Sequence, residues 1–203
     1  KVLGAALKQM GKINESLVPS QKSLQLNPQD AEPHYNLGVI LHELGRLNEA
    51  EGSYRQAIAL KPDYVEAHYN LGVILKELGK LDEAETSYRK AVALKPDYAK
   101  AHNNLGVILK EFGRLNEAEG SYRQAIALKP DYVEAHYNLG VILKELGKLD
   151  EAETSYRKAI ALKPDYAKAH NSLGGILKEF GKLDEACSAY IQAINLNPDF
   201  TDA

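Results

Sequence analysis

Apolar residues recur along most of the chain at three- and four-residue spacing, which is the spacing of one face of an α-helix. Leu37, Ile40, Leu41 and Leu44 form one such stripe. Gly45 follows it directly, and glycine suits the left-handed conformation in which many helices end. The pattern therefore predicts a helix, here called helix A, that ends at Leu44.

A second amphipathic stretch, here called helix B, follows after a short turn. Asn48 and Glu51 have the spacing of a capping box, so helix B is expected to begin near Asn48. It is expected to stop before Pro62, because the residue ahead of a proline is pushed out of helical geometry. Asp63 is then expected to cap the next helix A. The helix B residues predicted to point inward are Ala50, Tyr54, Ala57, Ile58 and Leu60.

The two-helix pattern is an internal repeat. Complete units span residues 31–64, 65–98, 99–132, 133–166 and 167–200, a period of 34 residues. Residues 1–30 fit the same frame as an incomplete, divergent repeat, and 201–203 fit the start of a further helix or a tail. Repeats of this length stack on their neighbours, so residues 1–203 are predicted to form a single solenoid. Residues 45–91 are identical to 113–159, which indicates a recent pairwise duplication, or design.

A glycine stands inside every complete helix A, at Gly38 and its equivalents. Glycine costs roughly 0.5–1 kcal/mol relative to alanine within a helix, so its recurrence needs a packing reason. We expect a close approach of helix B at this point, with the small residue Ala50 facing Gly38.

Seven positions of each complete unit match the pattern of the tetratricopeptide repeat family, which the chain resembles over essentially its whole length. In the first complete unit they are Leu37, Gly38, Leu41, Ala50, Tyr54, Ala57 and Pro62. The resemblance implies an all-α fold, a right-handed superhelical solenoid of antiparallel helix hairpins. In it, the A helices line a concave groove and the B helices form the convex back. The sequence looks most similar to bacterial arrays of this family and to the superhelical repeat domains of glycosyltransferases.

Composition and charge narrow the class of partner. The chain is 44% hydrophobic and 26% charged, which is typical of a soluble folded protein. A net charge of −3 provides no basic field for nucleic acid or for an anionic membrane. No apolar run approaches the ~20 residues that span a bilayer. The single cysteine, Cys187, suits a reducing compartment, so a cytoplasmic location is expected.

The sequence points to no metal, cofactor or catalytic site. Histidine replaces the family's usual large aromatic residue at five equivalent positions, His34, His68, His102, His136 and His170. Neighbouring helices pack about 8–10 Å apart, whereas zinc needs its ligands at about 2.0–2.3 Å. A structural role at the hairpin interface is therefore expected for these histidines. The serines and acids occupy repeated structural positions, so the chain is not expected to be an enzyme.

The candidate binding residues lie on helix A outside its core stripe. Asparagine precedes the helix A leucine at Asn36, Asn70, Asn104 and Asn138, and Ser172 takes this place in the last unit. In the glycosyltransferase relatives the equivalent asparagines form a ladder that binds a peptide main chain, and the resemblance implies the same use here. A carboxamide offers both donors and an acceptor to a backbone of any sequence. The alternative is that these asparagines are simply solvated polar residues.

Aromatic and basic residues flank the predicted asparagine ladder. The position before it carries Tyr35, Tyr69 and Tyr137, with Asn103 and Asn171 in the other two units. Tyrosine suits recognition surfaces, although here it can equally shield the neighbouring helix. Lys100 and Lys168, with Asn70 and Asn138, supply fragments of the family's clamp for a carboxylate terminus. That clamp is not expected to be complete, because Tyr69 and Val73 replace its other members.

The leading hypothesis is a protein-interaction scaffold that binds an extended or partly helical segment of a partner in the groove. The alternative is a substrate-targeting arm of a larger enzyme such as a glycosyltransferase. RNA reading by helical repeats is disfavoured by near-identical units and a negative net charge. Neither end of the sequence has a polar capping unit, so weak end-to-end self-association is also expected.

Overall fold

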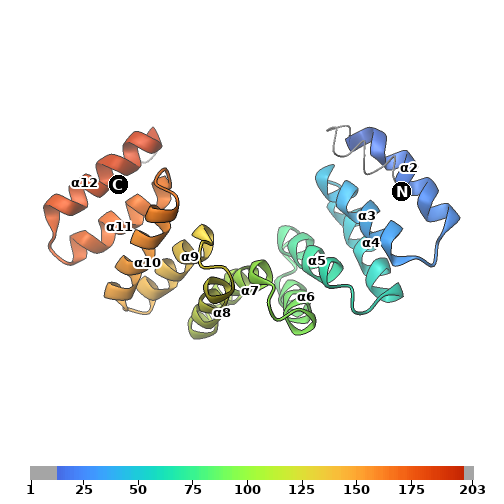
Figure 1. Ribbon diagram of the computed structural model, residues 1–203, viewed down its shortest axis with the longest axis horizontal. Coiled ribbons are helices and arrows are strands. Elements are labelled where there is room, and N and C mark those ends of the chain that lie inside the picture. Colours follow the sequence, from blue (N-terminus) through green and yellow to red (C-terminus); the bar gives the residue numbers. More distant parts are fainter. Residues whose placement is uncertain (1–12, 199–203) are drawn as a thin grey trace. The chain divides into compact units, whose positions relative to one another are not determined.

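The computed structural model describes residues 13–198, and the elements in this range are all α-helices (Figure 1). They are α2 (Ile13–Leu26), α3 (Ala31–Glu43), α4 (Leu47–Leu60), α5 (Val65–Glu77), α6 (Leu81–Leu94), α7 (Ala99–Glu111), α8 (Leu115–Leu128), α9 (Val133–Glu145), α10 (Leu149–Leu162), α11 (Ala167–Glu179) and α12 (Leu183–Leu196). The expected helix A of the incomplete first repeat and the expected start of a further helix at 201–203 lie outside the described residues. None of the described helices is long and apolar enough to cross a lipid bilayer.

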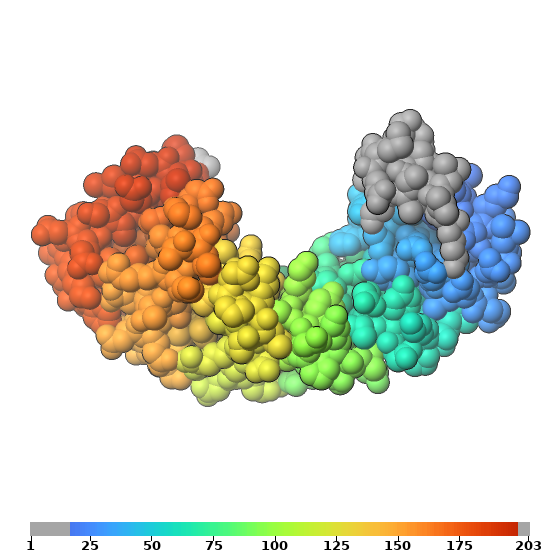
Figure 2. All heavy atoms as spheres, in the orientation of Figure 1, coloured from blue at the N-terminus to red at the C-terminus, as the bar shows by residue number. Residues whose placement is uncertain are grey.

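The helices group into two compact units, residues 1–96 and 97–203. In the first unit, hairpins α3–α4 and α5–α6 pack through α4 and α5, and α2 packs on α3. In the second unit, hairpins α7–α8, α9–α10 and α11–α12 pack through α8 with α9 and α10 with α11. Within each unit, segments that follow one another in the sequence also lie next to one another in space, as the progression of colours in Figure 2 shows. The predicted helix A–helix B hairpins are confirmed, whereas one continuous solenoid over 1–203 stays a prediction.

The hairpin core is built where a helix A glycine meets a helix B tyrosine. A Cβ added at Gly38 would lie 2.7 Å from Cε1 of Tyr54, and Tyr54 is fully buried. The same contact recurs at Gly140, where an added Cβ would lie 2.6 Å from Cε1 of Tyr156. The expected close approach of helix B is thus present, but the residue that fills the space is the tyrosine rather than Ala50. The tyrosine ring fits here because glycine has no side chain to occupy the space.

The end of helix A and the start of helix B agree with the sequence, whereas the predicted cap of helix B does not. Gly45 has φ of 71°, and the N–H of Arg46 donates to the carbonyl of Leu41 at 2.8 Å, which closes the helix. Helix α4 begins at Leu47, next to the predicted Asn48, but no side chain caps it. The capping-box prediction was wrong because the Glu51 carboxylate bonds to Arg55 and Lys80 instead.

The predicted caps of helix A are also mostly wrong. Helix α5 begins after Tyr64, so Asp63 lies too early in the chain to cap it, and no side chain does. Only the first complete repeat differs among the described helices, since the Asp30 carboxylate there accepts from the N–H of Glu32 at 3.1 Å. Aspartate stands at the cap position itself in that repeat, where the later repeats have tyrosine.

Successive B helices are joined by ion pairs. In the second unit the buried carboxylate of Glu119 accepts from Arg123 on its own helix and from Lys148, 2.8 Å away, at the start of the next hairpin's helix B. Arg123 also donates to Glu151 of α10. The hydrogen bond from Lys148, reinforced by Arg123 and opposed by burial, lowers the pKa of Glu119 below its usual value. Within each unit, such contacts tie one hairpin to the next on the side of the B helices.

Two glycine substitutions test the glycine–tyrosine contact. Gly140→Ala is expected to destabilise the protein by about 1–3 kcal/mol, because the buried Tyr156 ring cannot move away from the added methyl group. Gly120→Ala is the matched control, since a Cβ there meets nothing within 4 Å. That variant is expected to gain about 0.5–1 kcal/mol from helix propensity. Urea unfolding followed by circular dichroism measures both, and equal midpoints would refute the contact.

The Glu119 ion pairs predict a pH-dependent stability. Because the pKa is lowered in the folded state, the contribution is present at neutral pH and is lost as the pH falls below about 4. Glu119→Gln is expected to cost about 1 kcal/mol at pH 7, a modest value because both basic partners are half-exposed. The difference from the unchanged protein should shrink at pH 3. Glu117→Gln, which removes an exposed carboxylate paired with Arg114, is the control and should change little.

Candidate functional site

The candidate site is the side of each helix A that carries the predicted ladder, here called the A face. On α3 it comprises Tyr35, Asn36, Val39 and His42, which share one side of the helix because they stand at three- and four-residue spacing. Asn36 is exposed, and Tyr35, Val39 and His42 are partly exposed. The opposite side of α3 carries the buried Leu37, Ile40 and Leu41. The A face is therefore the side of α3 that remains partly exposed.

In the first unit the ladder asparagine joins two adjacent A faces. The Asn70 Nδ2 donates to the hydroxyl of Tyr35 at 3.1 Å, from α5 to α3. At the other end of the same helices, His42 Nε2 lies 3.2 Å from the Glu77 carboxylate. Burial raises the pKa of Tyr35, so its hydroxyl stays protonated while it accepts from Asn70. One N–H of the Asn70 amide is thus used within the protein.

The second unit repeats this bond with a different acceptor. The Asn138 Nδ2 donates to Oδ1 of Asn103 at 3.1 Å, from α9 to α7, because asparagine replaces tyrosine in that unit. Asn103 is buried, and its own Nδ2 donates to Oδ1 of Asn104 at 3.3 Å. The sequence missed these bonds between the ladder and the preceding position. The two residues of each bond are 35 positions apart in the sequence. Residues at this separation come into contact only because adjacent A helices lie side by side.

The A-face tyrosines are held by other tyrosines. The Tyr35 ring lies 5.9 Å from that of Tyr54 on helix B and 4.9 Å from that of Tyr64 at the start of α5. Tyr137 packs in the same way on Tyr156 and Tyr166, at 5.8 and 5.1 Å. Burial raises the pKa of Tyr166 to about 12. These tyrosines shield the neighbouring helix, and they also leave part of each ring exposed on a rigid support.

The charges at the carboxyl end of the A face are paired. In the second unit Lys110 lies 3.3 Å from the Glu145 carboxylate and Lys144 lies 3.1 Å from that of Glu179. Both bonds run from one helix A to the next. The A face of this unit therefore carries mixed and largely compensated charge at that end.

Lys100 and Lys168, the predicted clamp residues, are exposed in the first turns of α7 and α11. Asn138, the proposed companion of Lys168, is bonded instead to Asn103. Asn70, the proposed companion of Lys100, belongs to the other unit and is bonded to Tyr35. Nothing in either unit assembles these residues into a carboxylate clamp.

The A face of α11 carries a hollow that sequence reasoning missed. It has a volume of about 280 Å³ and lies beside Gly175, which stands where the other complete units have valine. The signal was visible in the sequence as Leu-Gly-Gly-Ile at 173–176 in place of Leu-Gly-Val-Ile.

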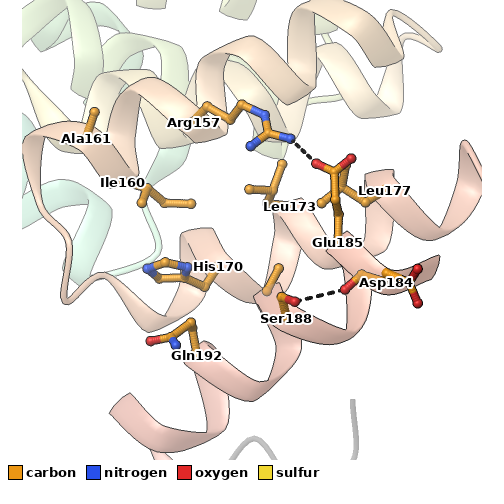
Figure 3. A pocket seen from close by; sticks show the side chains of 11 residues that line it. Arg157, Ile160, Ala161, His170, Leu173, Leu177, Asp184, Glu185, Ser188 and Gln192 are labelled. Atoms are coloured by element: carbon orange, nitrogen blue, oxygen red, sulfur yellow. Dashed lines mark hydrogen bonds and ion pairs between the residues drawn. The ribbon is translucent and has the colours of Figure 1, made fainter. Parts of the chain in front are cut away.

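A second hollow, of about 530 Å³, opens between the B helices α10 and α12 over α11 (Figure 3). Its floor includes Ile160, Leu173 and Leu177, and the ion pair of Arg157 with Glu185, 2.9 Å apart, bounds it. These floor positions are apolar in every complete repeat. The hollow thus follows from the spacing of successive B helices rather than from a residue particular to this place.

The recurring histidines are structural. His68 and His136 are buried, and their Nε2 atoms each lie 2.9 Å from the carbonyl oxygen of the proline six residues earlier, Pro62 and Pro130. His34 and His170 make the same bond with Pro28 and Pro164. The ring thus fixes the start of α3, α5, α9 and α11 to the preceding turn. In residues 13–198 no three histidine, cysteine or acidic side chains gather as a metal-binding group.

Comparisons with known proteins agree with this geometry. A family model described as "TPR repeat" matches residues 4–45, 40–79 and 74–113, and one described as "Tetratricopeptide repeat" matches 103–167 and 137–199. None of the curated proteins matches the chain significantly.

Solved structures show the same fold. MamA is 27% identical with a TM-score of 0.75, over 82% of this chain and 98% of that one. YrrB, described as a TPR protein with an unusual peptide-binding site, is 24% identical with a TM-score of 0.76, over 89% and 93%. PilF of Pseudomonas aeruginosa is 22% identical with a TM-score of 0.86, over 97% and 89%. With repeats matched along nearly its whole length, the chain belongs to the tetratricopeptide repeat family.

Proposed function

We propose that the chain is a non-catalytic scaffold whose A faces bind an extended or partly helical segment of a partner protein. The residues that carry this function are Asn36, Asn70, Asn104, Asn138, Tyr35, Tyr69, Tyr137 and Asn103. The observation that carries the proposal is the recurrence of a partly or fully exposed carboxamide at one position of four A helices.

The hydrogen-bonding capacity of the ladder supports the proposal. A carboxamide has two N–H donors and an oxygen with two acceptor positions. Asn70 and Asn138 each give one N–H to the preceding A helix. The Asn138 amide therefore keeps a second N–H and its oxygen, which is the pair needed to bond one peptide unit of a bound main chain.

The fixed geometry of the ladder favours binding. The bond of Asn70 to Tyr35 and the packing of Tyr35 against Tyr64 hold these side chains before a partner arrives. A partner then loses less free energy to the ordering of the site than it would on a mobile surface. The internal hydrogen bonds of Asn70 and Asn138 therefore hold these side chains in a fixed orientation.

The electrostatics of the A face favour a protein segment over a nucleic acid. The lysines Lys110 and Lys144 are paired with Glu145 and Glu179. Binding a phosphate chain needs cations that are free to replace its counterions. A neutral main chain with apolar side chains needs none, and the exposed edges of the tyrosines offer apolar contact to it. YrrB, described as having a peptide-binding site, shares the fold, but at 24% identity it supports no more than that.

The test removes three rungs of the ladder at once. We expect Asn70→Ala, Asn104→Ala and Asn138→Ala together to weaken binding of a peptide selected on the unchanged protein by at least about tenfold, since each rung contributes about 0.5–1.5 kcal/mol. Fluorescence anisotropy measures the affinity. The thermal midpoint, followed by circular dichroism, should fall only slightly, because each lost internal bond is partly exposed.

The control carries the same three changes on the B helices, at the exposed Asn48, Asn116 and Asn195. It should bind the peptide as the unchanged protein does. A ladder variant that unfolds to the extent that it loses binding would show that the asparagines serve the fold alone.

A further inference from the structure

The hollow between α10 and α12 is separate from the A face (Figure 3). Helix α11 contributes His170, Leu173 and Leu177 to it, whereas the A face of α11 carries residues 171, 172, 175 and 178. Its volume of about 530 Å³ lies within the range of about 300–1,000 Å³ that is usual for ligand sites. The B-helix side of the second unit therefore has a candidate binding site of its own.

Three lining positions of α12 carry smaller side chains than their equivalents on α10. They are Ser188 for Thr154, Ala189 for Ser155 and Gln192 for Lys158. These replacements remove atoms from the wall of the hollow. A hollow of about 330 Å³ in the first unit has the same construction, with Gly52, Gln56 and His34 at the positions equivalent to Ser188, Gln192 and His170. A small residue, a glutamine and a histidine thus line a hollow in each unit.

The lining favours an uncharged occupant. The floor is apolar, because it consists of one isoleucine and two leucines. The Arg157 guanidinium at the edge is already paired, with Glu153 at 2.7 Å and with Glu185 at 2.9 Å. The Asp184 carboxylate lies at the outer edge and is turned away from the floor (Figure 3). No charge within the hollow itself therefore needs an ion from a ligand.

One polar atom of the lining is an acceptor without a partner. His170 Nε2 lies 2.9 Å from the Pro164 carbonyl oxygen, which can only accept a hydrogen bond. The proton of the neutral ring is therefore on Nε2, and Nδ1 is an acceptor to which no donor within residues 13–198 bonds. The His170 ring stands at the side of the hollow, across from Leu173 (Figure 3). The hollow thus combines an apolar floor with one acceptor at its side.

We propose that this hollow binds the indole ring of a tryptophan of a partner protein, with the indole N–H donating to His170 Nδ1. Indole carries one donor and no acceptor, which matches an apolar hollow whose uncommitted ring nitrogen is an acceptor. Its flat ring supplies a large apolar area to Ile160, Leu173 and Leu177. The paired Arg157 guanidinium at the edge can lie against the face of the ring. A tryptophan seated in a pocket is a common anchor of protein interfaces.

Other side chains fit the hollow less well. A lysine ammonium would give up water for an apolar floor, at a free-energy cost that one acceptor does not offset. Phenylalanine would leave the His170 acceptor without a donor. A tyrosine hydroxyl could donate, but its single ring covers less of the floor than indole does. The 203-residue chain contains no tryptophan, so a second copy of it cannot supply the ring.

N-acetyl-tryptophanamide is the probe for the full chain. Because the protein has no tryptophan, excitation beyond the absorption of tyrosine reports on the probe alone. Its emission should shift to shorter wavelength, and the shift should saturate as protein is added. N-acetyl-1-methyl-tryptophanamide, which has a methyl group in place of the indole hydrogen, should bind about fivefold more weakly, the value of one neutral hydrogen bond.

Two variants locate the probe. His170→Gln keeps an N–H donor for Pro164 and removes the acceptor, so it should weaken N-acetyl-tryptophanamide about fivefold and abolish the difference between the two probes. His136→Gln makes the same change one repeat earlier and should bind both probes as the unchanged protein does. Ser188→Leu fills the hollow from an exposed position of α12 and should weaken the probe by at least about tenfold. Thr154→Leu is its matched control at the equivalent exposed position of α10.

The outcomes are distinct from those for the proposed function, because the lining shares no residue with the A face. The absence of a saturable shift, or undiminished binding to Ser188→Leu, would overturn the hollow as a site. Equal affinity of the two probes for the unchanged protein would overturn the hydrogen bond to His170. Tighter binding of N-acetyl-lysinamide, measured by displacement of the fluorescent probe, would overturn the choice of an indole over a cation.

Discussion

The packing of one tyrosine ring on one glycine is the contact on which each hairpin depends. In the five complete repeats, a Cβ on the helix A glycine would lie between 2.6 and 2.8 Å from the ring, so the ring lies directly against the backbone of helix A. The consequence reaches the binding surface. The ring of Tyr54 that rests on Gly38 also supports Tyr35, which in turn packs on Tyr64 at the start of α5. A core contact thereby fixes the side chains offered to a partner.

Charged residues form ion pairs both on the B helices and on the A helices. On the B helices, Glu119 is buried with Arg123 and Lys148 and joins one hairpin to the next. On the A helices, pairs such as Lys110 with Glu145 join neighbouring helices at a partly exposed surface. Both sets include a contact from one hairpin to the next. Polar contacts therefore add to the packing that joins neighbouring hairpins.

The sequence predicted the hairpins well because helix boundaries depend on local chemistry. Gly45 ends α3 in the left-handed conformation and the chain leaves α4 ahead of Pro62, as expected. Predictions that needed the identity of a distant neighbour failed. Glu51 was assigned to a capping box from its spacing after Asn48, whereas its carboxylate accepts from Lys80 of another repeat. Periodicity predicts which face of a helix a residue occupies. It does not predict which side chain of a neighbouring helix contacts that residue, because this depends on how the helices pack.

A surface made of identical repeats has a physical limitation as a recognition site. On the proposed binding surface each rung offers the same carboxamide, so a main chain bound there would recover nearly all of its contacts after a shift by one repeat. Identical rungs therefore supply affinity without fixing register. Register requires a position that differs from its equivalents, and the second unit contains one where Gly175 opens a hollow beside Asn171. A side chain seated there would lose that contact on any shift, because valine takes the place of Gly175 in the other complete repeats. Selectivity for one register of a bound segment can therefore arise only at positions where a repeat differs from the others.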